Sequence, residues 1–496
     1  MELLSPAGNI EKLQYAYEYG ADAAYIGLKN FSLRVKADNF YENEATRVQE
    51  LKKLYPGKRL HCALNITFHN KDIENLKNEL DFFKAYPIDA FILQDIGIVR
   101  LLQKHFPNAQ LHLSTQANCI NSEAVKMYRD MGFSRVVLGR EASLAEIAEI
   151  KNAVPEMEIE VFAHGAMCIS YSGRCLLSAY MNGRSANAGF CSHSCRWDYD
   201  LGVLGSSIDS DEHALSFASS KKLAESGELV LREHQRPDEF FPIFEGENFT
   251  AILSSKDLCM IDHLNDLKKA GVDSLKIEGR MKSVYYVALV TRSYRKALDA
   301  LDGKISEEDA RPFIDELYKA KHREFATGFY YNHEDADKTT VGESDSEYDM
   351  VATIGRKLTC DEEKSIFAQS SSVCADFDAL LESLHPDARR AKEEDLRQHP
   401  EKRPVKLEKR ENYSLFEFIP LNKIDSGVEL EYVGPEILAI KDLSYFFVDK
   451  ETCCVTTWAS HGHEYYIYTD KKVKENFIAR MRDNEYVEGV FRSTGR

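Results

Sequence analysis

The stretch ELLSPAGNIEKLQYAYEYGADAAYIG, residues 2–27, contains a short apolar run, a helix-length amphipathic segment and a second short apolar run. This alternation continues to about residue 300 and is typical of parallel β/α units. The nine runs that read as strands are residues 2–6, 23–28, 61–67, 90–95, 111–115, 135–139, 158–164, 250–254 and 274–278. We expect eight of them to close into a TIM-like β/α barrel, with the ninth pairing outside it or capping an end; periodicity alone does not distinguish this from an open doubly wound sheet.

Polar side chains follow nearly every apolar run at its C-terminal end. They are Asn65, Gln94, Asp95, Ser114, Thr115, Gln116, Arg140, Glu141, His164, Lys256, Asp257, Glu278 and Arg280. In a β/α barrel these ends share one face, and barrel enzymes keep their chemistry there. Loops are polar in general, which explains any single one of these residues equally well. Their recurrence after seven strands favours a site on this face.

The pattern changes after the barrel. Six alternating runs, at 348–354, 413–419, 428–433, 437–440, 454–458 and 464–468, predict a small all-β, barrel-like C-terminal domain. We assign the barrel to residues 1–335, with a cysteine-rich loop at 160–200 and a flexible insertion rich in Ser, Asp, Glu and Ala at 204–228. The β domain is assigned to 346–475, with a charged helical insertion at about 371–411 and a tail at 476–496.

Composition limits the functional classes. The chain has 496 residues and a net charge of −18, which argues against a surface that binds nucleic acid everywhere, so any RNA contact is expected to be local. The first residues lack a basic region followed by an apolar one, and no apolar run reaches the ~18 residues of a membrane span. We therefore expect a cytoplasmic protein without a membrane partner, in which the eleven cysteines are not disulfides. Composition does not indicate the oligomeric state.

The cysteines are concentrated in EVFAHGAMCISYSGRCLLSAYMNGRSANAGFCSHSCRWDYD, residues 160–200. Cys168, Cys175, Cys191 and Cys195 have the spacing C-x6-C-x15-C-x3-C. Four thiolates without paired histidines bind either zinc or an iron-sulfur cluster. Structural zinc usually has two tight cysteine pairs, so the wide first pair favours a cluster; zinc, or thiols without a metal, remain the alternatives.

The same segment closely resembles the signature of the collagenase-like peptidase U-32 family. Further blocks resemble the family: residues 2–27, FSLRVKADNF from Phe31, HLSTQAN from His112, the run from Ser254 that contains KIEGRMKS, HREFATGFYY from His322 and NKIDSGVELEYVGP from Asn422. The family includes bacterial proteins that hydroxylate RNA or ubiquinone precursors without molecular oxygen. The resemblance is closest to the branch that makes 5-hydroxyuridine at the wobble position of tRNA and depends on prephenate or its biosynthetic pathway.

The resemblance implies a 4Fe-4S cluster on the four cysteines, the anticodon region of tRNA as partner, and prephenate or a related small molecule as co-substrate. For the chemistry of such a site we expect a set of proton carriers, Glu160, His164, Asp95 and Glu278. Tyr171 and Trp197 are candidates for stacking on a base, although a tryptophan is more often a core residue. Phosphate or a dicarboxylate would be bound by Lys256, Lys276, Arg280 and Lys282.

The main alternative is a peptidase, which needs an activated nucleophile or a hydrolytic metal. The sequence has no H-E-x-x-H and no G-x-S-x-G. Cys168 near His164 could mimic a Cys/His nucleophile in the sequence, but its use would remove a thiol from the set of four. A non-catalytic RNA-binding module is the third hypothesis, and it leaves both the cysteine set and the polar strand ends unexplained.

Overall fold

The computed structural model describes residues 1–28, 31–32, 39–41, 44–168, 170–175, 255–332 and 346–482, together with four two-residue strands between residues 230 and 251. The chain divides into two compact units, Met1–Asp345 and Ser346–Arg496, which are described separately. Cys191, Cys195, Trp197 and the expected insertion at 204–228 lie outside the described residues. None of the helices in the described ranges is both long and apolar enough to cross a bilayer.

The first unit is built on a closed barrel of eight parallel strands. Closure comes from β13, which pairs in parallel with β1 on one side and β7 on the other. The strands are β1 (Glu2–Pro6), β2 (Ala23–Ile26), β3 (Arg59–Leu64), β4 (Ala90–Leu93), β5 (Gln110–Leu113), β6 (Arg135–Val137), β7 (Glu158–Ala166) and β13 (Ser274–Ile277). The predicted TIM-like barrel is confirmed, and the open doubly wound sheet is ruled out.

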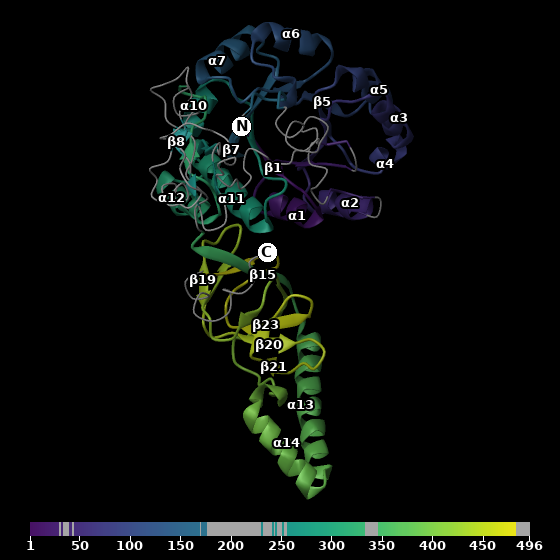
Figure 1. Cartoon of the computed structure of the whole chain (residues 1–496), viewed down its shortest axis with the longest axis vertical. Helices are drawn as coiled ribbons and strands as arrows, with labels where there is room; N and C mark the ends of the chain where they lie inside the picture. The colour runs from purple at the N-terminus through teal and green to yellow at the C-terminus, as the bar shows by residue number, and fades with distance from the viewer. Residues whose placement is uncertain are drawn as a thin grey trace, which may run out of the picture. The chain divides into compact units, whose positions relative to one another are not determined.

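Helices surround the barrel on its outside (Figure 1). The first of them shows how the sequence sets these elements: the Asn9 side chain caps the helix by accepting from Lys12 N at 2.9 Å, and Leu13, Ala16 and Tyr17 are buried on one face. The helices are α1 (Ile10–Glu18), α2 (Ala45–Leu54), α3 (Asn70–Asn78), α4 (Leu80–Lys84), α5 (Val99–His105), α6 (Ser122–Asp130), α7 (Leu144–Ala153), α10 (Leu264–Lys269), α11 (Val284–Leu301) and α12 (Glu307–Asp315).

The ninth expected strand, at 250–254, is not a barrel strand. Its first two residues form β11 (Thr250–Ala251), which pairs with β10 (Phe244–Glu245) in a separate two-stranded sheet. The barrel instead gains a strand outside the closed ring, β12 (Asp257–Cys259), which lies antiparallel to the end of β7 and carries β14 (Phe325–Ala326) on its other side. The expectation that one strand pairs outside the barrel is therefore met by a later segment.

The interior of the barrel is unusually polar. Strand registers place the side chains in layers of four from alternate strands, and such layers are generally filled by bulky branched apolar residues. The middle layer is Leu4, His61, His112 and Glu160; the layer toward the carboxyl ends of the strands is Tyr25, Ile92, Val137 and Lys276; the layer below is Ala23, Ala90, Arg135 and Ser274. All of these polar side chains are buried.

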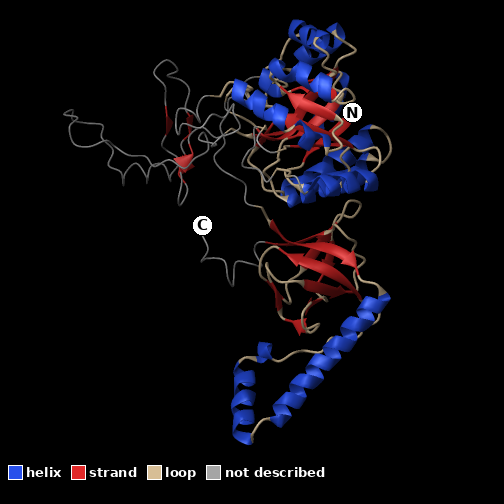
Figure 2. Ribbon diagram, turned by 90° about the vertical axis from the view of Figure 1, so that its right-hand side faces the viewer, coloured by secondary structure: helices blue, strands red, loops and turns tan. Residues whose placement is uncertain are grey.

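The second unit is a curled, eight-stranded antiparallel sheet, which confirms the expected small all-β domain (Figure 2). Its core is apolar and includes Phe416, Phe418, Phe447 and Ile467. The strands, in sheet order, are β19 (Ile440–Asp442), β18 (Leu430–Val433), β24 (Ile478–Arg482), β15 (Tyr348–Lys357), β16 (Ser414–Pro420), β23 (Tyr465–Thr469), β20 (Phe446–Asp449) and β21 (Val455–Thr456). A separate pair is formed by β17 (Ile424–Asp425) and β22 (Trp458–Ala459).

The helical insertion is longer than expected and the tail is shorter. The insertion begins with α13 (Cys360–Ser383) and continues with α14 (Pro386–Gln398), so it starts eleven residues before 371. A capping box at Thr359 and Glu362 fixes this start. The expected tail from 476 begins with β24, which pairs with β15 and β18 inside the sheet.

Candidate active site at the mouth of the barrel

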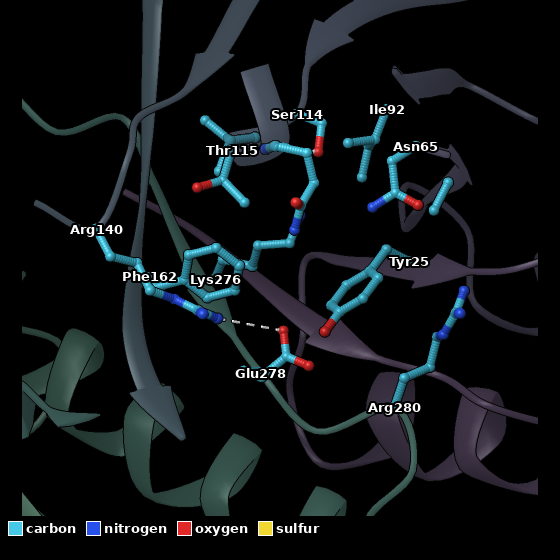
Figure 3. A pocket seen from close by; sticks show the side chains of 13 residues that line it. Tyr25, Asn65, Ile92, Ser114, Thr115, Arg140, Phe162, Lys276, Glu278 and Arg280 are labelled. Carbon is cyan, nitrogen blue, oxygen red and sulfur yellow. Dashed lines mark hydrogen bonds and ion pairs between the residues drawn. The ribbon is translucent and has the colours of Figure 1, made fainter. Parts of the chain in front are cut away.

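A small pocket of about 70 Å³ opens at the carboxyl ends of the barrel strands (Figure 3). Its lining includes Tyr25 of β2, Phe162 of β7 and Lys276 of β13, and residues just after strands, namely Gln116, Arg140, Glu278 and Arg280. Small-molecule sites usually measure roughly 300–1,000 Å³. This pocket is therefore the size of a reacting group and not of a whole ligand.

Lys276 forms part of the pocket floor. Its Nζ donates to Glu160 Oε1 at 2.9 Å and lies 4.5 Å from the centroid of the Tyr25 ring. The lysine side chain is 7% exposed, and Glu160 beneath it is fully buried. Packing between a carboxylate and an aromatic face fixes the position of the amino group. The pocket thus presents a held cation at its base.

Glu160 does not have the properties of the proton carrier that the sequence suggested. Its other oxygen accepts from Arg135 Nη1 at 2.9 Å, and the same Arg135 nitrogen lies 2.5 Å from Glu2 Oε1. Burial alone would raise the pKa of the Glu160 carboxyl, but Lys276 and Arg135 lower it to about 2. The carboxylate stays ionised at neutral pH and holds Lys276 in place.

Arg140 and Glu278 form the side of the pocket nearest the loop after β7. Arg140 Nη2 lies 3.5 Å from Glu278 Oε2, and its guanidinium carbon lies 3.9 Å from the centroid of the Phe162 ring. Both side chains are about one-sixth exposed. Figure 3 shows the guanidinium reaching toward the Glu278 carboxylate. Among the four expected proton carriers, Glu278 is the one that lines the pocket.

Arg280 enters the pocket from the opposite side and is 3% exposed. Its Nη2 donates to Ser32 Oγ at 2.7 Å. Gly27 makes room for it, because a Cβ at that position would lie 2.0 Å from Arg280 Nη1. Lys276 and Arg280, both expected to bind substrate, are brought to one pocket by the fold.

The beginning of the cysteine-rich loop is attached to the rim of this pocket. Ser172 N donates to Glu141 Oε1 at 2.6 Å, and Ser172 Oγ accepts from Arg140 N at 3.3 Å. Gly173 has φ +74°, and a Cβ there would lie 2.0 Å from the Gln116 carbonyl oxygen, so only glycine fits this approach. The turn at Ser172–Gly173 is therefore fixed beside two segments that line the pocket, at Gln116 and at Arg140.

Two of the four expected metal ligands flank this turn. Cys168 is exposed, Cys175 is partly exposed, and both are free thiols. Soft thiolates at the surface of a loop suit an iron-sulfur cluster, so the donors fit in kind. Within the described ranges no three His, Cys, Asp or Glu side chains gather as a metal site. Cys191 and Cys195 are outside those ranges, so the set of four stays a prediction, as does the role of Trp197.

The other expected site residues lie elsewhere. His164 is buried among the rings of Tyr286, Tyr294 and Phe325, and burial lowers its pKa to about 3. Asp95 accepts from the Gly97 and Phe68 amides and so caps a turn. Neither residue lines the pocket, and we withdraw both as proton carriers.

Two of the expected cations also have other contacts. Lys256 pairs with Glu324 at 2.6 Å, and Lys282 Nζ lies 5.4 Å from the Tyr286 ring centroid. Neither lysine is among the residues that line the pocket. Tyr171 is 67% exposed next to the fixed turn, which leaves its ring available for stacking.

The histidine pair under the pocket was not predicted from the sequence. His61 and His112 are fully buried with ring centroids 4.8 Å apart, and no hydrogen-bond partner was found among the described residues for either His61 nitrogen or for His112 Nδ1. Burial holds the pKa of both well below the usual range. The signal was available, since both lie at inward positions of predicted strands.

Comparisons with known proteins identify relatives of this chain. The model of Peptidase family U32 matches residues 8–340. The tRNA hydroxylation protein P of Escherichia coli (strain K12) is 41% identical over 346 residues, covering 67% of this chain and 75% of the relative. The 23S rRNA 5-hydroxycytidine C2501 synthase of the same strain is 33% identical over 61% of this chain and 40% of that protein. A protein named collagenase from Porphyromonas gingivalis is 28% identical over 66% of this chain and 73% of the relative.

Proposed function

This chain belongs to peptidase family U32, and from that premise we propose that it is an enzyme that hydroxylates RNA, with tRNA as its substrate. The two relatives with the words hydroxylation or hydroxycytidine in their names support an RNA hydroxylase. The finer proposal is conversion of the wobble uridine in the anticodon region to 5-hydroxyuridine, in the cytoplasm, without molecular oxygen, and with prephenate or a related metabolite as co-substrate.

One observation carries this proposal: the turn between Cys168 and Cys175 is fixed to the rim of the pocket that Lys276, Arg140 and Arg280 line. A thiolate-bound group on this loop would lie next to a site with held cations and aromatic rings. A 4Fe-4S cluster on Cys168, Cys175, Cys191 and Cys195 would supply a redox-active or Lewis-acid centre there. Arg174 and the pocket arginines would offset its negative charge.

The chain's own residues have distinct roles in this proposal. A base in a tRNA loop is already unstacked from a duplex partner, so it can be splayed into a protein site and stacked on an exposed ring such as Tyr171. Lys276 would polarise a carbonyl of the base or bind a carboxylate of the co-substrate. Glu278, at the rim, would accept the proton that leaves the base. Replacing C–H by C–OH is a two-electron oxidation, so the co-substrate would have to supply the oxygen atom and take up the two electrons.

The peptidase is the second candidate, because one relative carries the name collagenase. The described residues give this reading little support. His164, the histidine nearest to Cys168 in the sequence, is buried and its ring is enclosed by aromatic side chains, whereas Cys168 is exposed. Activation of a thiol needs a base within hydrogen-bond reach.

Nucleoside mass spectrometry of tRNA from cells that lack this protein tests the proposal. We expect 5-hydroxyuridine derivatives to disappear and to return with the wild-type chain, but not with Cys191→Ala. Cys259→Ala, a partly exposed cysteine outside the loop, is the matched control and should restore them. Anaerobically purified wild-type protein should contain iron and Cys191→Ala should lose it. Unchanged 5-hydroxyuridine in the deletion strain would overturn the proposed substrate, and metal-free protein that cleaves collagen through Cys168 would favour the peptidase.

A further inference from the structure

The second unit contains a groove of about 590 Å³ that no step of the proposed reaction uses. One wall is the first three turns of α13, with Lys364 and Phe367, and the other wall is the extended segment 406–409, with Lys406 and Lys409. The groove lies within the volume range of a nucleotide-sized ligand. It is a second candidate binding site, built entirely on the β unit.

The segment that carries the lysines is anchored on both sides. Leu407 is 2% exposed, and its backbone N–H donates to Ser370 Oγ of α13 at 2.9 Å. Just before it, the Val405 carbonyl accepts from Val455 N at 2.8 Å. Lys406 and Lys409 therefore extend from a backbone segment that these hydrogen bonds hold in place.

The cations of this segment fall into two groups. Lys402 and Arg403 each pair with a carboxylate of the helical hairpin, Asp395 at 2.7 Å and Asp378 at 2.8 Å. Lys406, Lys409 and Arg410 have no ion pair with any carboxylate in the described part of the chain, although the whole chain carries a net charge of −18. Three neighbouring cations without a carboxylate partner form a local concentration of positive charge, which favours the binding of an anion.

Arg410 is also oriented. Its guanidinium carbon lies 4.2 Å from the Phe446 ring centroid and 5.7 Å from that of Tyr413. A guanidinium stacked on a ring keeps its N–H edge available for bidentate contact with phosphate. Phe367 adds an aromatic surface inside the groove, on which a base can stack.

We propose that Lys406, Lys409 and Arg410 and the groove beside them bind the sugar-phosphate backbone of the RNA substrate. This inference rests on the proposed function for the identity of the RNA. Glu363 and Glu408 also line the groove; Glu363 accepts from Leu415 N at 2.9 Å and is thereby held by the protein. Local positive charge in an acidic protein is the arrangement that phosphate contact requires.

The test compares two triple variants of the full chain that change its net charge by the same amount. The groove variant is Lys406→Gln, Lys409→Gln and Arg410→Gln; the control is Lys402→Gln, Arg403→Gln and Arg356→Gln, three exposed cations of the same unit that are ion-paired. Binding of tRNA is measured against salt concentration. We expect the groove variant to lose about tenfold or more in affinity, and the slope of log K against log salt to fall by about 2–3, because each lost phosphate contact contributes roughly 0.7–0.9. The control should change less than twofold.

Equal losses in both variants would show that only net charge matters and would overturn the proposal, as would no loss in either. If polyglutamate competes with tRNA for the protein as well as RNA does, and the groove variant loses this competition too, the result would overturn the RNA proposal in favour of an acidic protein partner.

The hydroxylation assay separates the groove proposal from the proposed function. If wild-type protein hydroxylates tRNA while the groove variant binds it normally, the groove proposal alone falls; if the groove binds RNA but no uridine is hydroxylated, the proposed function alone falls. Circular dichroism of both variants controls for folding.

Discussion

The interiors of the two units are filled in opposite ways. The β unit packs aromatic and aliphatic side chains such as Phe418 and Ile467 into an apolar core. The barrel holds an ionic network in its interior, in which Lys276, Glu160, Arg135 and Glu2 contact one another in turn. Buried ion pairs rarely stabilise more than apolar packing of the same volume. The barrel network is therefore better explained by the pocket above it: it fixes a lysine amino group at the bottom of the site, a task that an apolar core cannot perform.

The contrast between the two interiors predicts that an isosteric change inside the barrel has the largest effect on stability. Glu160→Gln keeps the shape of the side chain but removes the buried counter-charge of Lys276 and one of the three carboxylates around Arg135. We expect a loss of about 3–5 kcal/mol in the free energy of unfolding of the barrel unit, measured by urea denaturation. Glu158→Gln is the control, because that carboxylate pairs with the same arginine but is 41% exposed, and it should cost far less. Equal effects of the two changes would contradict a network built around the buried carboxylate.

The second effect concerns activity. Lys276→Gln removes the held cation from the pocket, and we expect kcat for tRNA hydroxylation to fall on the order of 10²-fold, as when one preorganised electrostatic group is removed from an active site. Lys256→Gln removes a lysine that is paired with Glu324 and does not line the pocket, and it should keep wild-type kcat. Single-turnover kinetics on folded protein measures both. If Lys276→Gln keeps the wild-type kcat, the buried ion network has a structural role only.

The third effect is a dependence on pH. His61 and His112 face each other and have Glu160, Arg135, Arg59 and Lys276 around them. Burial depresses the pKa of both histidines, so their neutral forms contribute stability above the unfolded pKa of about 6.5, and this stability is lost as the pH falls below it. The expected loss is about 1.4 kcal/mol per pH unit for each histidine, between pH 6.5 and 5. Urea denaturation at pH 7 and pH 5 should show a smaller difference for His112→Phe than for wild type; the same difference in both proteins would count against this origin.

The smallest effect is expected in the β unit. Ile467 is fully buried in the apolar core, and Ile467→Val removes one methylene without disturbing any charge. We expect a loss of about 0.5–1.5 kcal/mol, independent of pH between 7 and 5. Calorimetry of the full chain measures it. A loss as large as that of Glu160→Gln would remove the contrast between the two interiors.

The sequence predicted the strands of the barrel well because they are short and nearly continuous apolar runs. It failed where charge is buried. β24 carries Arg480, which is fully buried against Glu431 at 2.7 Å, and a strand with such residues reads as a polar tail. The strands that contain Glu160 and Arg135 were predicted, but the ion pair between these residues was not, because burial of a charged pair depends on partners far apart in the chain.

The site was partly predictable. Lys276, Glu278 and Arg280 follow from the rule that polar residues at strand ends meet on one face. His164 does not follow it, because the pairing of β13 with β7 shifts register between Lys276 and Ile277, and its side chain lies against α11. Periodicity counted along a single strand does not reveal such a shift.

The pairing of β12 with the end of β7 has a consequence for assembly. Asp257 lies opposite Ala166, so the chain leaves the barrel at residue 167 and returns beside the point of departure. A long excursion whose two ends are already neighbours imposes almost no constraint on the scaffold it leaves. The eight-stranded ring can therefore close without waiting for the segment between these ends to fold.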